Sequence, residues 1–218
     1  FELHNKCVPE HLLNIELVGE IKEATVNQNE AYKLIITKDS VFIKAITDTG
    51  VYRAKQTLNQ LIESSSNKTS IPLCDITDWP SFRIRGFMHD IGRSYISVDE
   101  LKKHIRLLSK FKINTFHWHL TENQGWRLES KVFPELNAKE IADYCKQHKI
   151  LLIPEIDMPG HSAAFVRAMG VDMQSDKGMS ILKTLLNEIC IDIFPDLPYL
   201  HIGTDEVEFT NPKFVPEM

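Results

Sequence analysis

Four groups of polar residues each follow an apolar, strand-like segment in the second part of the chain. They are His89-Asp90 with Arg93, His117-Trp118-His119 with Glu122, Glu155 through His161, and Asp205-Glu206. Carboxylates can move protons in a reaction, and an arginine suits the paired oxygens of a polar substrate. Polar groups after the C-terminal ends of strands are also how a β/α barrel builds its active face. The pattern therefore predicts a hydrolytic site centred on Asp205-Glu206.

Alternating strands and helices must position these groups. We expect strands at 84–88, 114–120, 150–156 and 199–203, and helices at 98–111, 139–148 and 179–190. Strand and helix in alternation indicate a parallel sheet with right-handed crossovers. The helix at 98–111 follows Ser97, and Glu100 stands three residues later, which is the spacing of a capping box. The segment Ile150–Ile153 is apolar on both faces, as a buried parallel strand should be.

The expected fold class is α/β, a (β/α)8 TIM barrel of which residues 78–218 supply only about the first four βα units. A closed barrel needs eight units and typically about 250 residues, so we expect the other strands to lie outside this sequence. Residues 1–77 are expected to form a small α+β domain. In it, segments 31–37 and 41–46 form an antiparallel pair, 51–62 forms a helix across one face, and 75–80 is a connector.

Composition excludes several classes of protein. The net charge of -5 and the absence of a basic run disfavour nucleic acid as a partner. No apolar stretch reaches the length of a membrane span, and residues 1–4 do not resemble the start of a signal peptide. The four cysteines form no C-x-x-C pair and are expected to be free thiols. Nucleotide-binding glycine motifs are also absent, so neither a dinucleotide nor a nucleoside triphosphate is expected.

As a set, the motifs resemble glycoside hydrolase family 20, the β-N-acetylhexosaminidases. The motifs are RGFMHDIGR, HWHLTENQGWR, PEIDMPGH and HIGTDE, at residues 85–93, 117–127, 154–161 and 201–206. Residues 1–77 resemble the small α/β domain that precedes the barrel in this family. The resemblance implies removal of terminal non-reducing N-acetyl-β-D-hexosamine, GlcNAc or GalNAc, from glycans or oligosaccharides. It implies no cofactor and no metal, and a secreted, periplasmic or lysosomal location.

The resemblance also implies a division of labour within the carboxylate pair. Glu206 would be the general acid/base, and Asp205 would stay ionised to orient the substrate's acetamido group. Family 20 departs from the two-carboxylate scheme because the acetamido oxygen of the substrate is the nucleophile. Adjacent residues of a regular strand point to opposite faces. For both side chains to reach one pocket, we therefore expect the backbone to leave strand geometry between Thr204 and Glu206.

Further roles are implied for residues of the other motifs. Arg93 would bind hydroxyl groups of the terminal sugar, and Glu122 and His161 would surround Glu206. His119 and Asp157 would support the site, although a core histidine and a capping aspartate are equally compatible with the sequence. Asn123 stands where the family commonly has an aspartate, which puts in doubt any role that needs a charge there.

Two other classes of protein remain open from the residues alone. His117 and His119 lie on one strand face, which is the arrangement that a metal-dependent amidohydrolase on a TIM barrel would need for a metal pair. A sugar-binding protein without catalysis is the second alternative. The aromatic side chains that enclose the sugar in this family come largely from the second half of the barrel, which this chain does not contain. The oligomeric state is not predicted.

Overall fold

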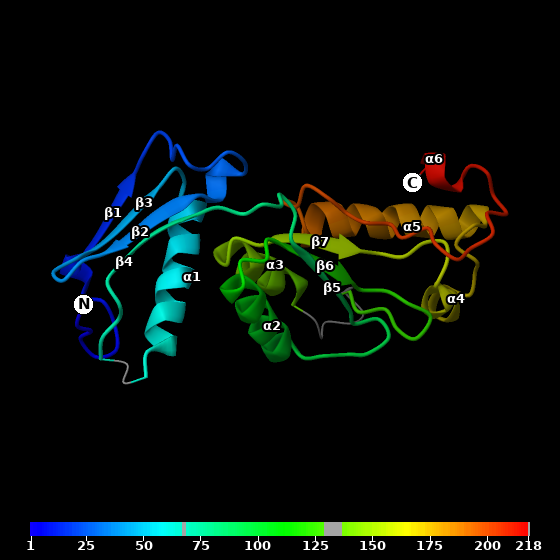
Figure 1. Ribbon diagram of the computed structural model, residues 1–218. Coiled ribbons are helices and arrows are strands. Elements are labelled where there is room, and N and C mark those ends of the chain that lie inside the picture. The colour runs from blue at the N-terminus through cyan, green and yellow to red at the C-terminus, as the bar shows by residue number, and fades with distance from the viewer. Residues whose placement is uncertain (67–68, 129–136, 218) are drawn as a thin grey trace. The chain divides into compact units, whose positions relative to one another are not determined.

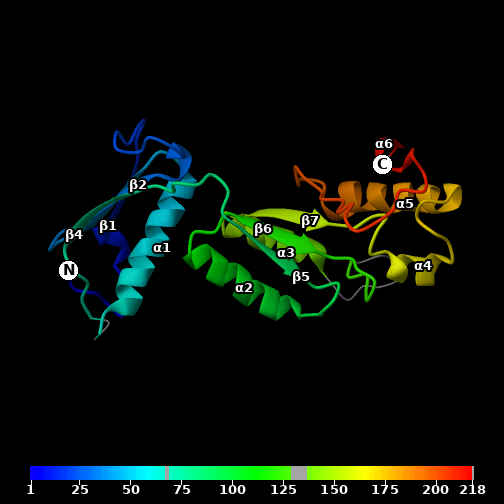
Figure 2. The ribbon, with the colours of Figure 1, turned by 45° about the vertical axis from the view of Figure 1, so that its right-hand side comes forward.

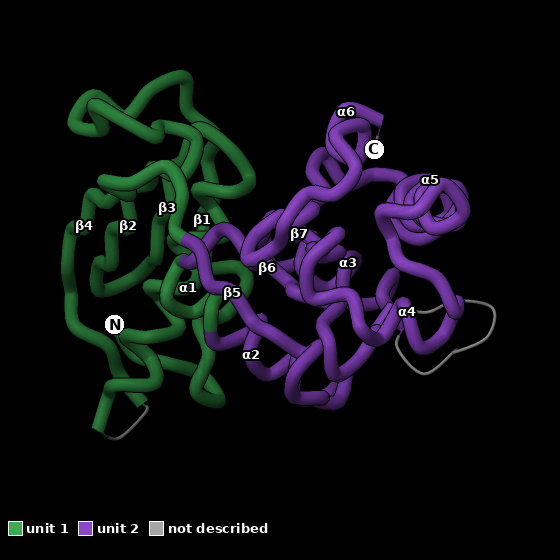
Figure 3. The backbone as a smooth tube through the Cα atoms, turned by 90° about the vertical axis from the view of Figure 1, so that its right-hand side faces the viewer, with its two compact units in different colours: residues 1–85, 108–112 green, residues 86–107, 113–218 purple. Residues whose placement is uncertain are grey.

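The computed structural model describes residues 1–66, 69–128 and 137–217. The chain divides into two compact units, one made of residues 1–85 and 108–112, the other of residues 86–107 and 113–218 (Figure 3). The proposed domain boundary near residue 77 stays a prediction. In the part of the chain that the structure describes, no helix is long and apolar enough to cross a membrane.

The first unit is a four-stranded sheet with one long helix, α1, against it (Figure 1). The strand order is β1-β3-β2-β4, with β1 parallel to β3 and the other two pairs antiparallel. Its elements are η1 (Glu10–Leu12), β1 (Leu13–Leu17), η2 (Gln28–Glu30), β2 (Tyr32–Ile36), β3 (Val41–Ala45), α1 (Asp48–Ser64) and β4 (Cys74–Asp78). The predicted antiparallel pair and helix are confirmed, but the β1–β3 pair makes the sheet mixed. The expected connector at 75–80 was wrong, because most of it is β4.

The alternation of buried and partly exposed residues explains how the sheet of the first unit packs against its helix. In β2 and β3 every second residue is buried, and these residues form one core with Ala54 and Leu58 of α1. The helix begins at a cap in which Thr47 Oγ1 accepts hydrogen bonds from the backbone N–H groups of Thr49 and Gly50. A buried ion pair joins Arg53 Nε to Glu30 Oε2 at 2.8 Å.

The second unit is a parallel sheet in the order β5-β6-β7, with α2 and α3 on one face (Figures 1 and 2). The elements that begin in it are β5 (Gly86–Asp90), α2 (Val98–Lys110), β6 (Thr115–His119), α3 (Ala138–Gln147), β7 (Leu151–Glu155), α4 (Ala163–Met169), α5 (Asp176–Glu188), the π-helix η3 (Ile189–Ile193) and α6 (Phe214–Glu217). Consecutive parallel strands with both connecting helices on one face are the repeating unit of a β/α barrel. At the start of α2, Ser97 Oγ accepts a hydrogen bond from Glu100 N–H at 3.3 Å, so the predicted cap forms.

The prediction of a fourth strand at 199–203 was wrong. Only His201 makes a β-bridge, parallel to Glu155. Two hydrogen bonds hold it there, from Ile156 N–H to His201 O at 3.0 Å and from His201 N–H to Pro154 O at 2.9 Å. The pairing is short because the chain turns at Gly203, whose φ is +65°. The predicted direction of the segment beside β7 is nevertheless correct.

Candidate functional site

Glu155, the last residue of β7, lies among three imidazole rings. His117 and His119 share one face of β6, and the register places His119 directly beside Glu155. The Glu155 Oε2 atom lies 2.7 Å from His117 Nε2 and 2.8 Å from His119 Nδ1. Glu155 Oε1 lies 3.1 Å from His201 Nδ1. No role was predicted for Glu155 or His201, and His117 was placed only in the alternative of a metal pair, although pairing β6 with β7 in register brings His117 and Glu155 together.

The charges in this cluster oppose the effect of burial. Burial would raise the pKa of Glu155, but close contact with His119 and the positive charges of the neighbouring imidazoles hold that pKa below its ordinary value. Burial would lower the pKa of His119, yet contact with Glu155 raises it. For His117 burial prevails, and its pKa is lowered despite the same carboxylate. His119 therefore supports Glu155 and, at 3.7 Å, also approaches Glu122 Oε1.

The backbone between Gly203 and Glu206 leaves strand geometry, as predicted. Thr204 has φ +81° and Glu206 has φ +48°, a left-handed conformation that residues other than glycine adopt rarely. The turn rests on Asp157, whose Oδ1 accepts a hydrogen bond from Thr204 N–H at 3.4 Å. A strained turn of this kind, held by a buried side chain, is common at functional sites.

Asp157 is 2% exposed. Its backbone N–H donates to Thr121 Oγ1 at 2.9 Å, which ties the end of β7 to the segment after β6. Burial, followed by the nearby negative charge of Asp205, raises the pKa of Asp157 to about 6. Asp157 thus supports the turn that carries Asp205.

His161 connects the acidic residues of two other motifs. Its Nδ1 lies 3.1 Å from Glu122 Oε1, and its Nε2 lies 3.3 Å from Glu206 Oε2 and 3.8 Å from Asp205 Oδ2. Gly160 allows this close approach, because a Cβ there would stand 2.6 Å from the carbonyl oxygen of Asp205. The structure thus brings together four of the residues predicted from the sequence, and an imidazole between two carboxylates is a suitable route for a proton.

Arg93 lies at the edge of this group. One guanidinium nitrogen contacts Asp90 Oδ2 at 2.6 Å, and the other forms an ion pair with Glu122. The side chain of Arg93 is half exposed, whereas that of Glu122 is buried. Burial would raise the pKa of Asp90, but hydrogen bonds from Arg93 hold it below its ordinary value. Asp90 thus orients Arg93, a contact that was not predicted from the sequence although both residues belong to one motif.

The carboxylate pair itself is open to solvent on the described part of the chain. The side chain of Asp205 is 66% exposed and that of Glu206 is 78% exposed. The described residues therefore form one side of a site around this pair and do not enclose it.

Asn123 has a structural contact that needs no charge. Its side-chain oxygen accepts a hydrogen bond from Ala163 N–H at 3.1 Å, at the first residue of α4, and its backbone oxygen accepts one from Arg167 at 2.8 Å. An amide oxygen satisfies a free N–H at a helix start as well as a carboxylate does. The substitution that the sequence analysis noted is therefore compatible with this fold.

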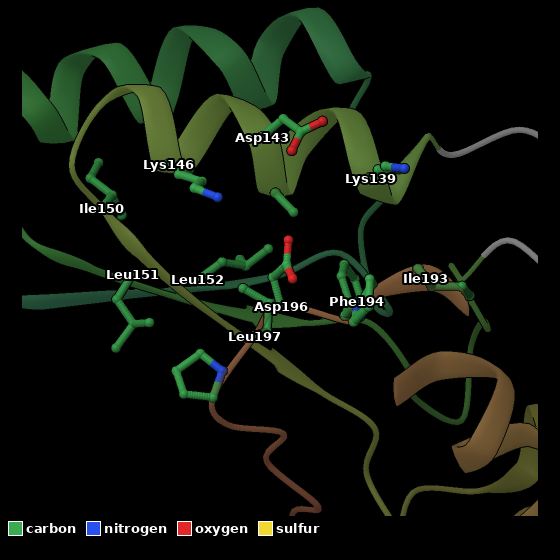
Figure 4. Close-up of a pocket in the computed structure, with 13 residues that line it drawn as sticks. Lys139, Asp143, Lys146, Ile150, Leu151, Leu152, Ile193, Phe194, Asp196 and Leu197 are labelled. Atoms are coloured by element: carbon green, nitrogen blue, oxygen red, sulfur yellow. The ribbon is translucent and has the colours of Figure 1, made fainter. Parts of the chain in front are cut away.

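A cavity of about 240 Å³ also lies in the second unit, away from the four motifs (Figure 4). Residues from α3, from β7 and from the segment 193–198 line it, and Asp143, Lys146, Phe194 and Asp196 are among them. It contains none of the residues that the motifs supply, so it is not the candidate catalytic site.

Comparisons with known proteins show the family of this chain. The model of the glycosyl hydrolase family 20 catalytic domain matches residues 82–140 and 137–176, and the model of domain 2 of the same family matches residues 8–79. The chain belongs to glycosyl hydrolase family 20. The prediction from the motifs is confirmed.

Curated relatives and solved structures agree with this assignment. The chain is 33% identical to a β-hexosaminidase of Porphyromonas gingivalis, over 82% of this chain and 29% of the relative. It is 30% identical to the β-hexosaminidase subunit alpha of Rattus norvegicus, over 87% of this chain and 42% of the relative. A crystal structure of β-N-acetylhexosaminidase from Bacteroides fragilis matches with TM-score 0.77 and 31% identity, over 90% of this chain and 46% of the other.

The match in structure confirms the predicted fold class. A family 20 exo-β-N-acetylglucosaminidase from Vibrio harveyi, solved in complex with N-acetylglucosamine, also has a TM-score of 0.77, at 28% identity, and covers 90% of this chain and 38% of the other. The family 20 chain described here thus spans less than half the length of these relatives. A metal-dependent amidohydrolase would explain only the two histidines of one motif, and the comparisons do not support it.

Proposed function

We propose that this chain carries the acid/base side of a β-N-acetylhexosaminidase that removes terminal, non-reducing GlcNAc or GalNAc residues from glycans. The reaction would retain the anomeric configuration through assistance by the substrate. Relatives named β-hexosaminidase and the family 20 models support this activity. The site supports it through carboxylates and an imidazole, which are the groups that glycoside hydrolysis uses.

One observation carries the proposal. Asp205 and Glu206 are adjacent in sequence, yet both lie near His161 Nε2, at 3.8 and 3.3 Å. The left-handed residues Thr204 and Glu206 make this possible, since a regular strand would send the two side chains to opposite faces. A pair that faces the same substrate can divide two tasks, proton transfer and fixed negative charge.

In the first step, Glu206 gives its proton to the glycosidic oxygen while the carbonyl oxygen of the 2-acetamido group attacks the anomeric carbon. The bond to the leaving group breaks, and a cyclic oxazolinium ion forms. Asp205 accepts a hydrogen bond from the acetamido N–H and offsets the positive charge of the ring. In the second step, ionised Glu206 removes a proton from water, which attacks the anomeric carbon and opens the ring. Protonated Glu206 and the β-configured sugar result.

The residues around the pair have supporting roles in this proposal. His161, in contact with Glu122, stabilises the ionised state of Glu206 between the two steps. Asp90 and Glu122 hold the guanidinium of Arg93, so that its exposed edge can donate to sugar hydroxyl groups. Asp157 keeps the turn under Asp205 in place.

A stable thiazoline analogue of the oxazoline tests the assisted step in the full-length protein. The proposal predicts competitive inhibition, because the analogue resembles the cyclic intermediate. Asp205→Asn should weaken inhibition by the analogue together with turnover, since both depend on the N–H contact. Asp143→Asn is the matched control, because Asp143 is an exposed acid beside the cavity of Figure 4.

Two outcomes would contradict the proposal. An active full-length enzyme that the thiazoline does not inhibit would exclude the oxazoline route. A folded full-length protein that binds N-acetylhexosamine but shows no turnover, with or without Glu206, would instead be a sugar-binding protein.

A further inference from the structure

The segment that carries the carboxylate pair lies outside any strand or helix. After the bridge at His201, residues 202–213 belong to neither kind of element. Asp205 and Glu206 are exposed, so packing against a core does not fix their side chains. A proton donor must nevertheless be held close to its productive position, because an error of about 1 Å can reduce a rate about 100-fold. Contacts from other segments must therefore fix this part of the backbone.

One such contact lies on the N-terminal side of the pair. Thr204 N–H donates a hydrogen bond to Asp157 Oδ1 at 3.4 Å. Thr204 directly precedes Asp205 in the sequence, so this bond fixes the backbone next to Asp205. Asp157 is buried and therefore provides a fixed acceptor. The first member of the pair thus has an anchor of its own.

A second anchor, Gln174, lies on the C-terminal side of the pair. Its side chain reaches from the turn before α5 to residues 208–211, which pass the start of that helix (Figure 1). Gln174 Nε2 donates to Glu208 O at 3.0 Å. Gln174 Oε1 accepts from Thr210 N–H at 2.8 Å and from Asn211 N–H at 3.2 Å. One amide side chain thus satisfies three backbone groups of a segment that has no secondary structure to satisfy them.

The backbone at Gln174 is itself held in place. Gln174 N–H donates to Asp172 Oδ1 at 2.6 Å, and Ser175 Oγ donates to Asp172 O at 2.7 Å. Ser175 Oγ also accepts from Gly178 N–H at 3.0 Å and so caps α5. A Cβ at Gly178 would stand 1.9 Å from Asp172 O, which shows how closely the turn packs against the helix. The side chain of Gln174 therefore starts from a fixed position.

We infer that Gln174 is a positioning residue for Glu206. This role rests on the proposed function, in which Glu206 gives its proton to the leaving group. Glu206 stands two residues before Glu208, the first residue that Gln174 holds, whereas Asp205 stands next to the anchor at Thr204. Loss of the Gln174 amide therefore frees the backbone after Glu206 and leaves Asp205 in place. Gln174 acts through the backbone and takes no part in making or breaking bonds.

Gln174→Met tests this role in the full-length protein, because it removes the amide and keeps the length of the side chain. On aryl N-acetyl-β-glucosaminides with poor leaving groups, kcat should fall by about 10–100-fold. On those with good leaving groups kcat should fall far less, because they need no proton. Inhibition by the thiazoline analogue should be retained, since Asp205 keeps its anchor. Gln147→Met is the matched control, because Gln147 is an exposed glutamine at the end of α3, and it should change neither quantity.

Gln174→Glu is a second variant, for which a smaller effect is expected. Its carboxylate still accepts from the N–H groups of Thr210 and Asn211 but cannot donate to Glu208 O. Its loss of kcat on poor leaving groups should therefore lie between that of Gln174→Met and none. A substitution that only destabilises the fold would lower kcat by one factor for every substrate, because it reduces the amount of folded enzyme. Thermal unfolding of each variant measures that amount independently.

Comparison with Glu206→Gln separates the role of Gln174 from the proposed function. If Glu206→Gln shows a loss that depends on the leaving group, while both Gln174 variants show an equal loss or no loss across the series, the positioning role is overturned and the acid role of Glu206 stands. If Glu206→Gln itself loses activity equally on all substrates, the proposed function fails, and the role of Gln174 fails with it. A loss that depends on the leaving group in all three variants is the expected result.

Discussion

Asp157 leaves no space for a side chain at Gly203. A Cβ at Gly203 would stand 1.9 Å from Asp157 Oδ1, and Gly203 also has φ +65°, which disfavours residues with a Cβ. Because Gly203 has no side chain, the chain can pass close to Asp157 and turn two residues before Asp205. This contact also makes the position of the carboxylate pair dependent on one buried carboxyl group.

Gly203→Ala should therefore displace the turn and abolish turnover of the full-length enzyme. The free energy of unfolding should fall by about 2–4 kcal/mol, the sum of left-handed strain and a forced shift of Asp157. Gly170→Ala is the control, because Gly170 has φ +69° but no atom within 4 Å of its Cβ position. It should lose only about 1 kcal/mol and retain activity. Equal losses in the two variants, measured by urea unfolding, would show that the contact with Asp157 is unimportant.

The raised pKa of Asp157 predicts how stability depends on pH. Since its folded pKa of about 6 exceeds the ordinary value of 3.8, the folded chain holds a proton between these values that the unfolded chain releases. The group's contribution to stability is thus present below about pH 4 and is lost as the pH rises through 6. The loss should amount to about 2–3 kcal/mol, at 1.4 kcal/mol for each pKa unit.

Asp157→Asn should remove this pH dependence, because an amide of the same shape does not titrate. Its side-chain oxygen can still accept the hydrogen bond from Thr204. Between pH 4 and pH 8, the free energy of unfolding should decline less for Asp157→Asn than for the original chain. If the two declines coincide, Asp157 does not hold the proton. Asp143→Asn, at an exposed position, should keep the original decline.

The buried ion pair of Glu30 with Arg53 predicts that removing the carboxylate will strongly destabilise the first unit. The side chains are 6% and 2% exposed, and Glu30 also contacts Arg85 at 2.6 Å. Removing the carboxylate takes the buried negative charge of Glu30 away from both guanidinium groups, so Glu30→Gln should cost about 3–5 kcal/mol. Glu23→Gln breaks an exposed pair with Lys33 and should lower the free energy of unfolding far less, because water screens exposed pairs. Similar midpoints of chemical unfolding for the two variants would contradict this.

Much of the fold could be predicted from the sequence, because its periodic patterns are strong. The strands at β5, β6 and β7 and the helices α2, α3 and α5 appear where strand and helix periodicity placed them, with ends shifted by a few residues. The strand expected at 199–203 failed because its apolar residues do not reveal that Gly203 turns the chain. The helix α4, only seven residues long, was missed because it is too short to show a repeat.

For the candidate site, the sequence predicted several of the residues but not all of their contacts. Recognisable motifs identified His161, Glu122 and Arg93, and strand geometry alone required the unusual backbone at Thr204 to Glu206. The contacts of Glu155 depend on the register between β6 and β7, which hydrophobic runs on both faces do not specify. The assignments of catalytic and binding roles to these residues stay predictions.

In the proposed reaction, Glu206 gives the proton to the leaving group. Full-length protein with Glu206→Gln should be compared with the original protein on aryl N-acetyl-β-glucosaminides whose phenol leaving groups differ in pKa. If Glu206 is the acid, the variant should lose far more activity on substrates with poor leaving groups than on those with good ones, because good leaving groups need no proton. An equal loss across the series in a folded Glu206→Gln protein would contradict the assignment.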